Sequence, residues 1–148
     1  MNLRNLLSVD TICLELKSTS KESIIEEMVD LLVASGKIQH RTEALSAVLD
    51  RERKMSTGMQ NGIAIPHGKT EKVEALVATL ALKKEGADFD ALDGQPSKIF
   101  VMTLSPEGRS GPHIQFLAEI SRLLSDASVR TRLLNASSPE DILQLLSG

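Results

Sequence analysis

Three histidines are the side chains of this 148-residue sequence whose ring nitrogens could act as nucleophiles near neutral pH. His67 lies between Pro66 and Gly68, after the short apolar run 63–65. Proline stiffens the approach to the ring and glycine lets another backbone come close, so we expect a turn that presents His67 at the surface. From this context alone two interpretations stay open, a nucleophilic imidazole or a turn histidine without a role.

His113 and Arg51 are the other side chains that could handle an anion. His113 falls in the first turn of a helix predicted over 112–125, where backbone N–H groups favour a nearby anion. If His67 and His113 converge, the pair could bind a phosphoryl group. Arg51 ends a predicted helix, and its guanidinium could stabilise a transferring phosphoryl. The alternatives are a solvated His113 and an Arg51 that only complements its helix C-terminus. His40, in a polar turn, is expected to be solvated.

Other chemistries find little support in the residue spacing. The glycines around Lys69 do not have the interval of a phosphate-binding P-loop, and no GxSxG segment is present. The histidines are too scattered to suggest a metal site. Cys13 is the single cysteine, so an internal disulfide is excluded, and we expect it to pack as a small apolar side chain. The sequence therefore predicts no cofactor and no metal.

The composition is that of an ordinary globular protein, with 41% hydrophobic and 25% charged residues. A net charge of −3 and an aromatic content of 2% argue against a nucleic-acid partner, which calls for basic patches and stacking platforms. No apolar run approaches the roughly 20 residues that cross a bilayer, and the first residues lack the apolar core of a signal peptide. We therefore expect a cytoplasmic protein without membrane insertion.

Hydrophobic periodicity and turn residues predict the secondary structure. Strands are expected over 11–16, 63–65, 76–82 and 98–104. Helices are expected to start at Thr19 or Ser20 with Glu22 in a capping box, at Thr42, at Pro112, at Asp126 and at Ser138. Phe89 and Leu92 are expected to fold back onto the core. This order predicts an α/β fold, a single layered domain over 1–148 with a mixed central sheet flanked by helices.

Segment 56–68, which reads STGMQNGIAIPHG, carries a resemblance to a known family. It resembles the phosphorylation-site segment of the mannitol/fructose-type (type 2) enzyme IIA domains of the bacterial phosphoenolpyruvate:sugar phosphotransferase system, a family that includes nitrogen-regulatory IIA proteins. The likeness extends to the Arg51-Glu52 pair, to segment 89–96 and to His113. It departs at Ile114, where the family usually has leucine, and in the loop 106–112. The resemblance implies a fold of the phosphotransferase/anion-transport-protein type and one enzyme IIA domain.

The resemblance also implies a role for each site residue. His67 would be the phosphoacceptor, charged by the phosphohistidine of the carrier protein HPr. His113 would hydrogen-bond the phosphoryl group and Arg51 would stabilise its charge. Such a relay is a phosphotransferase step between two histidines, needs no metal, and depends on placement and charge stabilisation. Met59, Ile63 and Ile65 would contribute apolar contacts to the docking surface.

Three functions remain open after the resemblance. The chain could be a nitrogen-regulatory IIA protein whose phosphorylation state alters its binding to regulatory targets. It could be a sugar-transport IIA component that passes its phosphoryl group to a IIB domain. It could also be a protein-binding module of the same fold that is never phosphorylated, although the intact His67, His113 and Arg51 argue against this. The absence of IIB and membrane IIC segments from the 148 residues favours the regulator.

Overall fold

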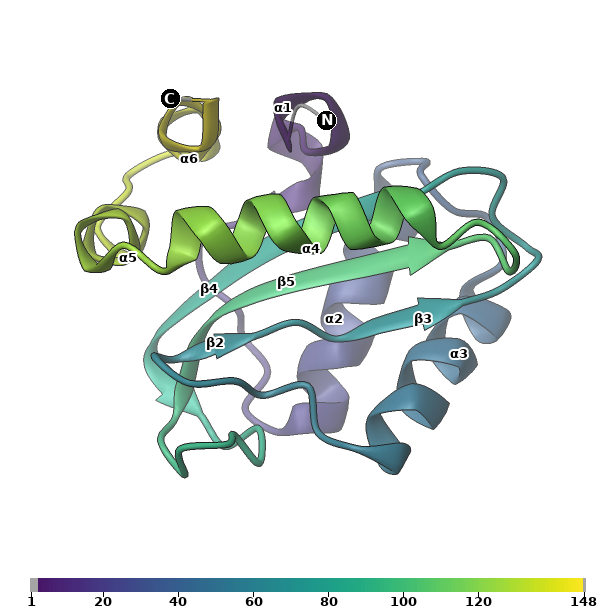
Figure 1. The fold of residues 1–148 in the computed structure, drawn as a ribbon, viewed down its shortest axis with the longest axis horizontal. Coiled ribbons are helices and arrows are strands. Elements are labelled where there is room, and N and C mark those ends of the chain that lie inside the picture. The colour runs from purple at the N-terminus through teal and green to yellow at the C-terminus, as the bar shows by residue number, and fades with distance from the viewer. Residues whose placement is uncertain (1–2, 148) are drawn as a thin grey trace.

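The computed structural model describes residues 3–147 as a mixed five-stranded sheet with helices on both faces (Figure 1). The strands are β1 (Ile12–Cys13), β2 (Ile63–Ala64), β3 (His67–Lys69), β4 (Val77–Ala87) and β5 (Ser97–Ser105). The helices are α1 (Leu3–Leu6), α2 (Lys21–Ala34), α3 (Arg41–Lys54), α4 (Gly111–Leu124), α5 (Ala127–Leu134) and α6 (Pro139–Ser147), with a 3₁₀ turn at Val9–Thr11. The predicted α/β class is therefore confirmed. Within residues 3–147, no helix is both long and apolar enough to cross a bilayer.

The sheet is built around the long antiparallel pair β4 and β5. β1 pairs with β4 in parallel, and both β2 and β3 pair with β5 in parallel. β2 and β3 follow one another along the same edge of β5 (Figure 1). This register places His67 opposite Thr103. The predicted mixed sheet is confirmed, and the edge of the sheet formed by β2 and β3 carries His67.

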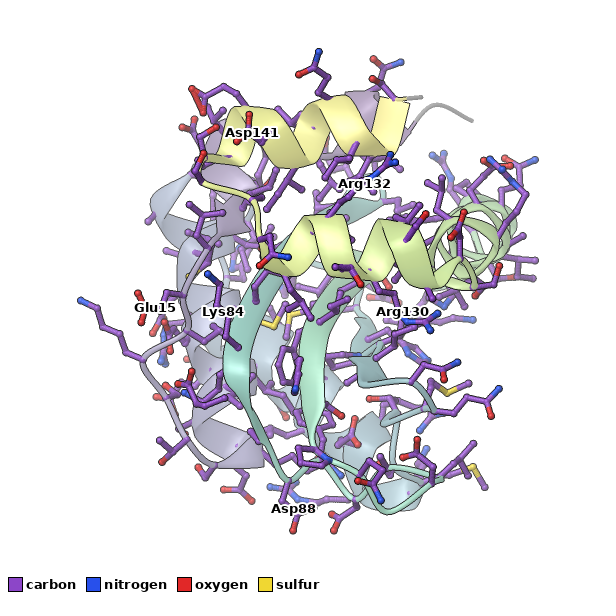
Figure 2. All side chains as sticks on the ribbon, turned by 90° about the vertical axis from the view of Figure 1, so that its left-hand side faces the viewer. Glu15, Lys84, Asp88, Arg130, Arg132 and Asp141 are labelled. Carbon is purple, nitrogen blue, oxygen red and sulfur yellow. The ribbon has the colours of Figure 1, made fainter. Side chains whose placement is uncertain are left out.

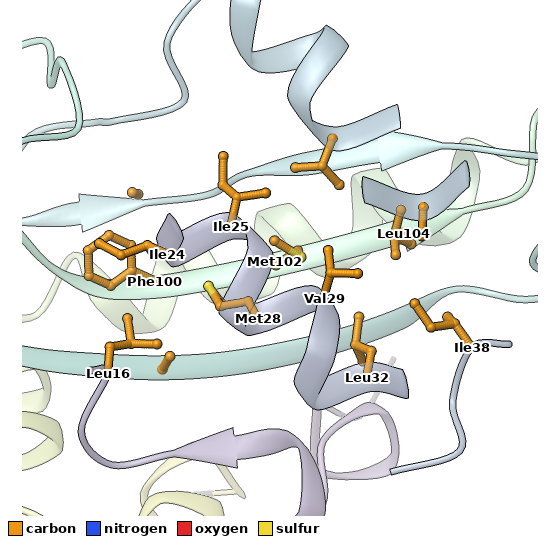
Figure 3. Close-up of a cluster of buried hydrophobic side chains, with 14 of the residues drawn as sticks. Leu16, Ile24, Ile25, Met28, Val29, Leu32, Ile38, Phe100, Met102 and Leu104 are labelled. Carbon is orange, nitrogen blue, oxygen red and sulfur yellow. The ribbon is translucent and has the colours of Figure 1, made fainter. Parts of the chain in front are cut away.

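One face of the sheet is covered by α2 and α3. The apolar stripe of α2 meets alternate residues of β5, which contributes Phe100, Met102 and Leu104 (Figure 3). The α2 side chains in this cluster are Ile24, Ile25, Met28, Val29 and Leu32, all 0% exposed. This is the amphipathic face that the sequence pattern predicts.

The other face is covered by α4, α5 and α6, with α1 beside α6 (Figure 1). Here the intervening β5 residues Ile99 and Val101 pack against Phe116 and Ile120 of α4. Since both faces of β5 are buried, its central segment 99–102 is apolar at every position instead of alternating. Charged side chains such as Glu15 and Lys84 lie at the exposed surface (Figure 2). The sheet thus separates two apolar cores, one on each of its faces.

Several predicted details differ from the structure. The strand expected over 11–16 is only Ile12–Cys13, although the Leu16 amide donates to the Leu82 carbonyl at 2.9 Å beyond it. α2 is capped by Ser20, whose hydroxyl accepts from the Ser23 amide at 3.2 Å, so the predicted Thr19–Glu22 box is wrong. Local propensity does not distinguish between neighbouring cap candidates.

Three further expectations concern single residues. Phe89 is fully buried as predicted, whereas Leu92 is 79% exposed and does not join the core. α3 begins at Arg41, with His40 and not Thr42 at its N-cap. Cys13 is half-buried and packs against the α2 core, and burial raises the pKa of its thiol.

Candidate functional site

His67 and His113 lie side by side where β3 meets α4. His67 is the first residue of β3, which pairs with β5. His113 lies in the first turn of α4, one of the helices that cover the second face of the sheet (Figure 1). Their ring centroids are 4.9 Å apart and the rings are tilted by 39°. His113 is only 6% exposed, so its interpretation as a solvated residue at a helix start is wrong. The fold thus brings together two histidines that are 46 positions apart in the sequence (113 − 67).

The ring of His67 is oriented by its own backbone. Its Nδ1 lies 3.0 Å from the carbonyl oxygen of Ile65. A carbonyl oxygen can only accept, so Nδ1 must carry a proton and donate it. In the neutral ring Nε2 then holds the lone pair. The half-buried His67 therefore presents Nε2 as a nucleophile or acceptor.

The backbone beneath His67 is fixed on both sides. The Thr103 amide donates to the Pro66 carbonyl at 3.2 Å, which ties the start of β3 to β5. On the opposite face Gly68 packs directly on α3. A Cβ at Gly68 would lie 2.8 Å from backbone atoms of Ala47 and Val48, closer than side chains tolerate. His67 thus belongs to a short strand clamped between β5 and α3, and not to the turn that we expected.

The loop that precedes the site is anchored by Glu52 at the end of α3. This carboxylate is 7% exposed and accepts the Thr57 amide at 2.8 Å. It also forms an ion pair with Lys21 of α2 at 2.7 Å. Ser56 adds a second anchor, since its hydroxyl donates to the Phe89 carbonyl at 2.7 Å. Sequence reasoning singled out Glu52 only through the family resemblance and missed its buried ion pair, because the partner Lys21 is distant in sequence.

Both imidazoles are held in the neutral form. Burial lowers the pKa of His67, and the positive charge of Arg51 adds to this effect while the Ile65 carbonyl opposes it. Burial also lowers the pKa of His113 to about 4, helped by the charges of His67 and Lys69. Near pH 7 neither ring carries a charge. The lone pair of His67 is therefore available at physiological pH.

Arg51 lies in the last turn of α3, near enough to His67 for its charge to act on that ring. Its Nη1 donates to the Met55 carbonyl at 2.8 Å. This bond uses one of the several N–H donors of the guanidinium and leaves others for an anion. The structure therefore places Arg51 near His67, without a direct hydrogen bond from its guanidinium to either histidine ring among residues 3–147.

The apolar residues expected around His67 differ in exposure. Met59 is 41% exposed, Ile65 is half-buried, and Ile63 is buried against the α4 core. Ile63 is therefore not available for docking. Ile114, next to His113, is 61% exposed and was not among the residues expected at this surface. Its exposure follows from its position on α4, which turns His113 inward and Ile114 outward.

The site shows no arrangement for a resident metal ion. In the described part of the chain, no three histidine, cysteine or acidic side chains lie close enough together to hold one. The groups at the site are two adjacent neutral imidazoles and an arginine whose charge acts on one of them, His67. This set can accept and stabilise a small anion, and its nucleophilic nitrogen can carry that anion covalently.

The chain as a whole is similar to known proteins. Residues 5–148 match the family model described as "Phosphoenolpyruvate-dependent sugar phosphotransferase system, EIIA 2". The fructose-specific EIIA component of Haloferax volcanii is 37% identical over 146 residues, which cover 99% of this chain and 95% of that protein. The fructose-specific EIIABC component of Bacillus subtilis is also 37% identical over 99% of this chain, which spans 23% of that longer protein. A nitrogen regulatory protein of Bradyrhizobium diazoefficiens is 31% identical, covering 99% of this chain and 95% of that protein.

Solved structures show the same fold. The nitrogen regulatory protein IIA-Ntr of Neisseria meningitidis superposes with a TM-score of 0.90 at 29% identity, over 97% of this chain and 98% of that one. The IIA component in a complex of IIA-mannitol with phosphorylated IIB-mannitol from Escherichia coli superposes with a TM-score of 0.82 at 27% identity, over 96% and 97% of the two chains. Sugar-specific and regulatory relatives are thus similar to this chain to a comparable degree.

Proposed function

We propose that this chain, which belongs to the EIIA 2 family of the phosphoenolpyruvate-dependent sugar phosphotransferase system, relays a phosphoryl group through Nε2 of His67. The observation that carries the proposal is the hydrogen bond from His67 Nδ1 to the Ile65 carbonyl at 3.0 Å. It holds the ring proton away from Nε2, and burial keeps the ring neutral. The nucleophile is therefore prepared before any partner arrives.

The donor is the phosphohistidine of an HPr-type carrier protein. The Nε2 lone pair of His67 forms a bond to phosphorus as the donor's N–P bond breaks. The electron pair of that bond stays on the donor imidazole, which leaves neutral when its other ring nitrogen is protonated. His67 keeps its Nδ1 proton, and the Ile65 carbonyl stabilises the positive charge that develops on the ring. One phosphohistidine replaces another, so the step is reversible and depends on in-line placement.

His113 and Arg51 stabilise the phosphoryl group in this proposal. With the ring centroids 4.9 Å apart, an oxygen of a phosphoryl group on His67 comes within reach of an N–H of His113. Arg51 adds a positive charge that already acts on His67. Neutralising the charge that spreads over the equatorial oxygens is the main contribution a protein can make to phosphoryl transfer.

For the onward step we propose a nitrogen-regulatory role, in which the phosphorylation state of His67 alters binding to target proteins. The TM-score of 0.90 to the IIA-Ntr protein supports it. A second candidate is transfer to the IIB domain of a fructose-type permease, supported by 37% identity to a fructose-specific EIIA component. The two candidates share the chemistry at His67 and differ only in the partner that follows.

The first test is the intact mass of the protein after incubation with phosphoenolpyruvate, enzyme I and HPr. We expect one acid-labile phosphoryl group on the wild type and none on His67→Ala. Adding a fructose-type IIB domain then separates the two candidates. Loss of the phosphoryl group to IIB supports transport, and its retention supports regulation. An unmodified wild type in the presence of charged HPr would contradict the proposed function and favour the unphosphorylated binding module.

A further inference from the structure

The ring of His113 contacts a buried hydroxyl group, that of Thr103. The Oγ1 atom of Thr103 on β5 is 3.0 Å from Nδ1 of His113. Thr103 is 1% exposed and His113 is 6% exposed, so water does not compete for this contact. Thr103 also stands opposite His67 in the β3–β5 register. A single residue of the central strand therefore touches one histidine and supports the strand of the other.

The direction of this hydrogen bond follows from the available acceptors. Among residues 3–147, Nδ1 of His113 is the one acceptor within hydrogen-bonding distance of the Thr103 hydroxyl. If His113 donated from Nδ1, the hydroxyl proton of Thr103 would be buried without a partner, which is costly. If Thr103 donates, its proton and the Nδ1 lone pair satisfy each other. The second arrangement leaves no buried polar group unpaired.

The N-terminal end of α4 reinforces this arrangement. His113 occupies the first turn of the helix, where the helix dipole disfavours a positive ring. A neutral imidazole carries a single N–H, and the Thr103 bond occupies the Nδ1 lone pair. The one proton of the ring then resides on Nε2.

We propose that Thr103 is a positioning residue for phosphoryl transfer, because its hydroxyl holds the proton of His113 on Nε2, the nitrogen left to donate to a phosphoryl oxygen on His67. The inference rests on the proposed role of His67. No proton moves in the transfer step. Thr103 acts only by fixing which nitrogen of His113 donates and how the ring is oriented, as supporting residues do for other imidazole sites. The opposite tautomer would turn a lone pair towards the phosphoryl oxygens and repel them.

The direct test is long-range proton–nitrogen NMR on ¹⁵N-labelled, unphosphorylated protein, which reports the tautomer of each histidine. We expect the proton of wild-type His113 on Nε2. Thr103→Val replaces the hydroxyl by a methyl group of similar shape and should give a mixture of tautomers. Thr103→Ser keeps the hydroxyl and should restore the wild-type pattern. A wild-type proton on Nδ1, or an unchanged tautomer in Thr103→Val, would overturn the proposal. If Thr103→Val does not fold, the wild-type and Thr103→Ser spectra still decide it.

A second measurement follows the transfer itself. The rate of phosphoryl acceptance from phosphorylated HPr should fall about tenfold in Thr103→Val and stay near the wild-type rate in Thr103→Ser, as expected for one misdirected hydrogen bond in the transition state. A folded Thr103→Val with the wild-type rate would overturn the positioning role. A wild type that accepts no phosphoryl group at all would instead refute the proposed function. The tautomer spectra distinguish these two failures, because they are recorded without phosphorylation.

Discussion

His113 is a titratable side chain that the fold keeps neutral in a buried position. Its pKa is about 4 in the folded protein, against an ordinary value of 6.5. Between these two values the unfolded chain binds a proton that the folded chain does not, so the free energy of unfolding decreases as the pH falls. Above pH 6.5 both states are neutral and the penalty vanishes. The shifted pKa of His67 acts in the same direction.

We therefore predict that wild-type stability falls between pH 6.5 and pH 4 by an amount that includes a His113 contribution on the order of 3 kcal/mol, at about 1.4 kcal/mol per pKa unit. His113→Asn, which cannot be protonated, should show a shallower decrease. Urea unfolding at a series of pH values measures both curves. Parallel curves for the two proteins across this range would show that His113 is not held neutral by the fold.

At this scale the sequence pointed to the candidate residues but not to their environments. His67 stood out because of its proline and glycine neighbours, and His113 and Arg51 because of their positions at predicted helix ends, while the family resemblance implied a role for each. The burial of His113 could not be predicted, because it depends on the packing of α4 across β5. Thr103 was missed as well, since a threonine within an apolar strand carries no signal until its neighbour on α4 is known.

Among the elements, β3 and α3 show most clearly how the site is positioned. Gly68 lets β3 approach α3 so closely that a Cβ would lie 2.8 Å from its backbone. Gly68→Ala should therefore force β3 away from α3, lower stability by about 1–3 kcal/mol and slow phosphoryl acceptance by His67. Thermal unfolding and the acceptance rate are the measurements.

Gly111 offers a matched control for this substitution. It lies at the start of α4, close in sequence to His113, and a Cβ there would meet no atom within 4 Å. Gly111→Ala should change stability by no more than about 0.5 kcal/mol. If the two alanine variants were equally stable, the close approach of β3 to α3 would not be a constraint on the site.

Helices α2 through α6, β5 and the short β2 follow from their apolar patterns. β4 was predicted only over 76–82 and runs on to Ala87, and α1 and β3 were not predicted. β3 was missed because its sequence, His-Gly-Lys, has no strand propensity and pairs only through the backbone of β5. Leu92 was placed in the core on hydrophobicity alone, yet the 88–93 loop carries it to the surface.

At the scale of the whole molecule, a partly buried ion pair joins α2 and α3 to the loop that precedes the site. Glu52 of α3 joins Lys21 of α2 to the loop at Thr57, and the Lys21 ammonium lies 5.0 Å from the ring centre of Phe89. We predict that Glu52→Gln lowers the free energy of unfolding by about 1–3 kcal/mol, because it leaves a partly buried ammonium without its nearest carboxylate. Chemical denaturation measures the change.

The exposed ion pair between Arg41 and Glu26 provides the control. These atoms are also close, at 2.8 Å, but the side chains are 40% and 52% exposed. Glu26→Gln should cost no more than about 0.5 kcal/mol, since solvent screens the pair. An equal loss in both variants would mean that burial does not set the contribution of the Glu52 network.

In the proposed function, the relation of this molecule to its partners rests on one atom, Nε2 of His67. The most direct test is phosphorus–nitrogen correlation NMR on the ¹⁵N-labelled protein after phosphorylation by the phosphoenolpyruvate, enzyme I and HPr relay. The hydrogen bond from Nδ1 to the Ile65 carbonyl predicts that phosphorus couples to Nε2 of His67 and that Nδ1 keeps its proton. Coupling to Nδ1, or to a nitrogen of any other residue, would contradict the account.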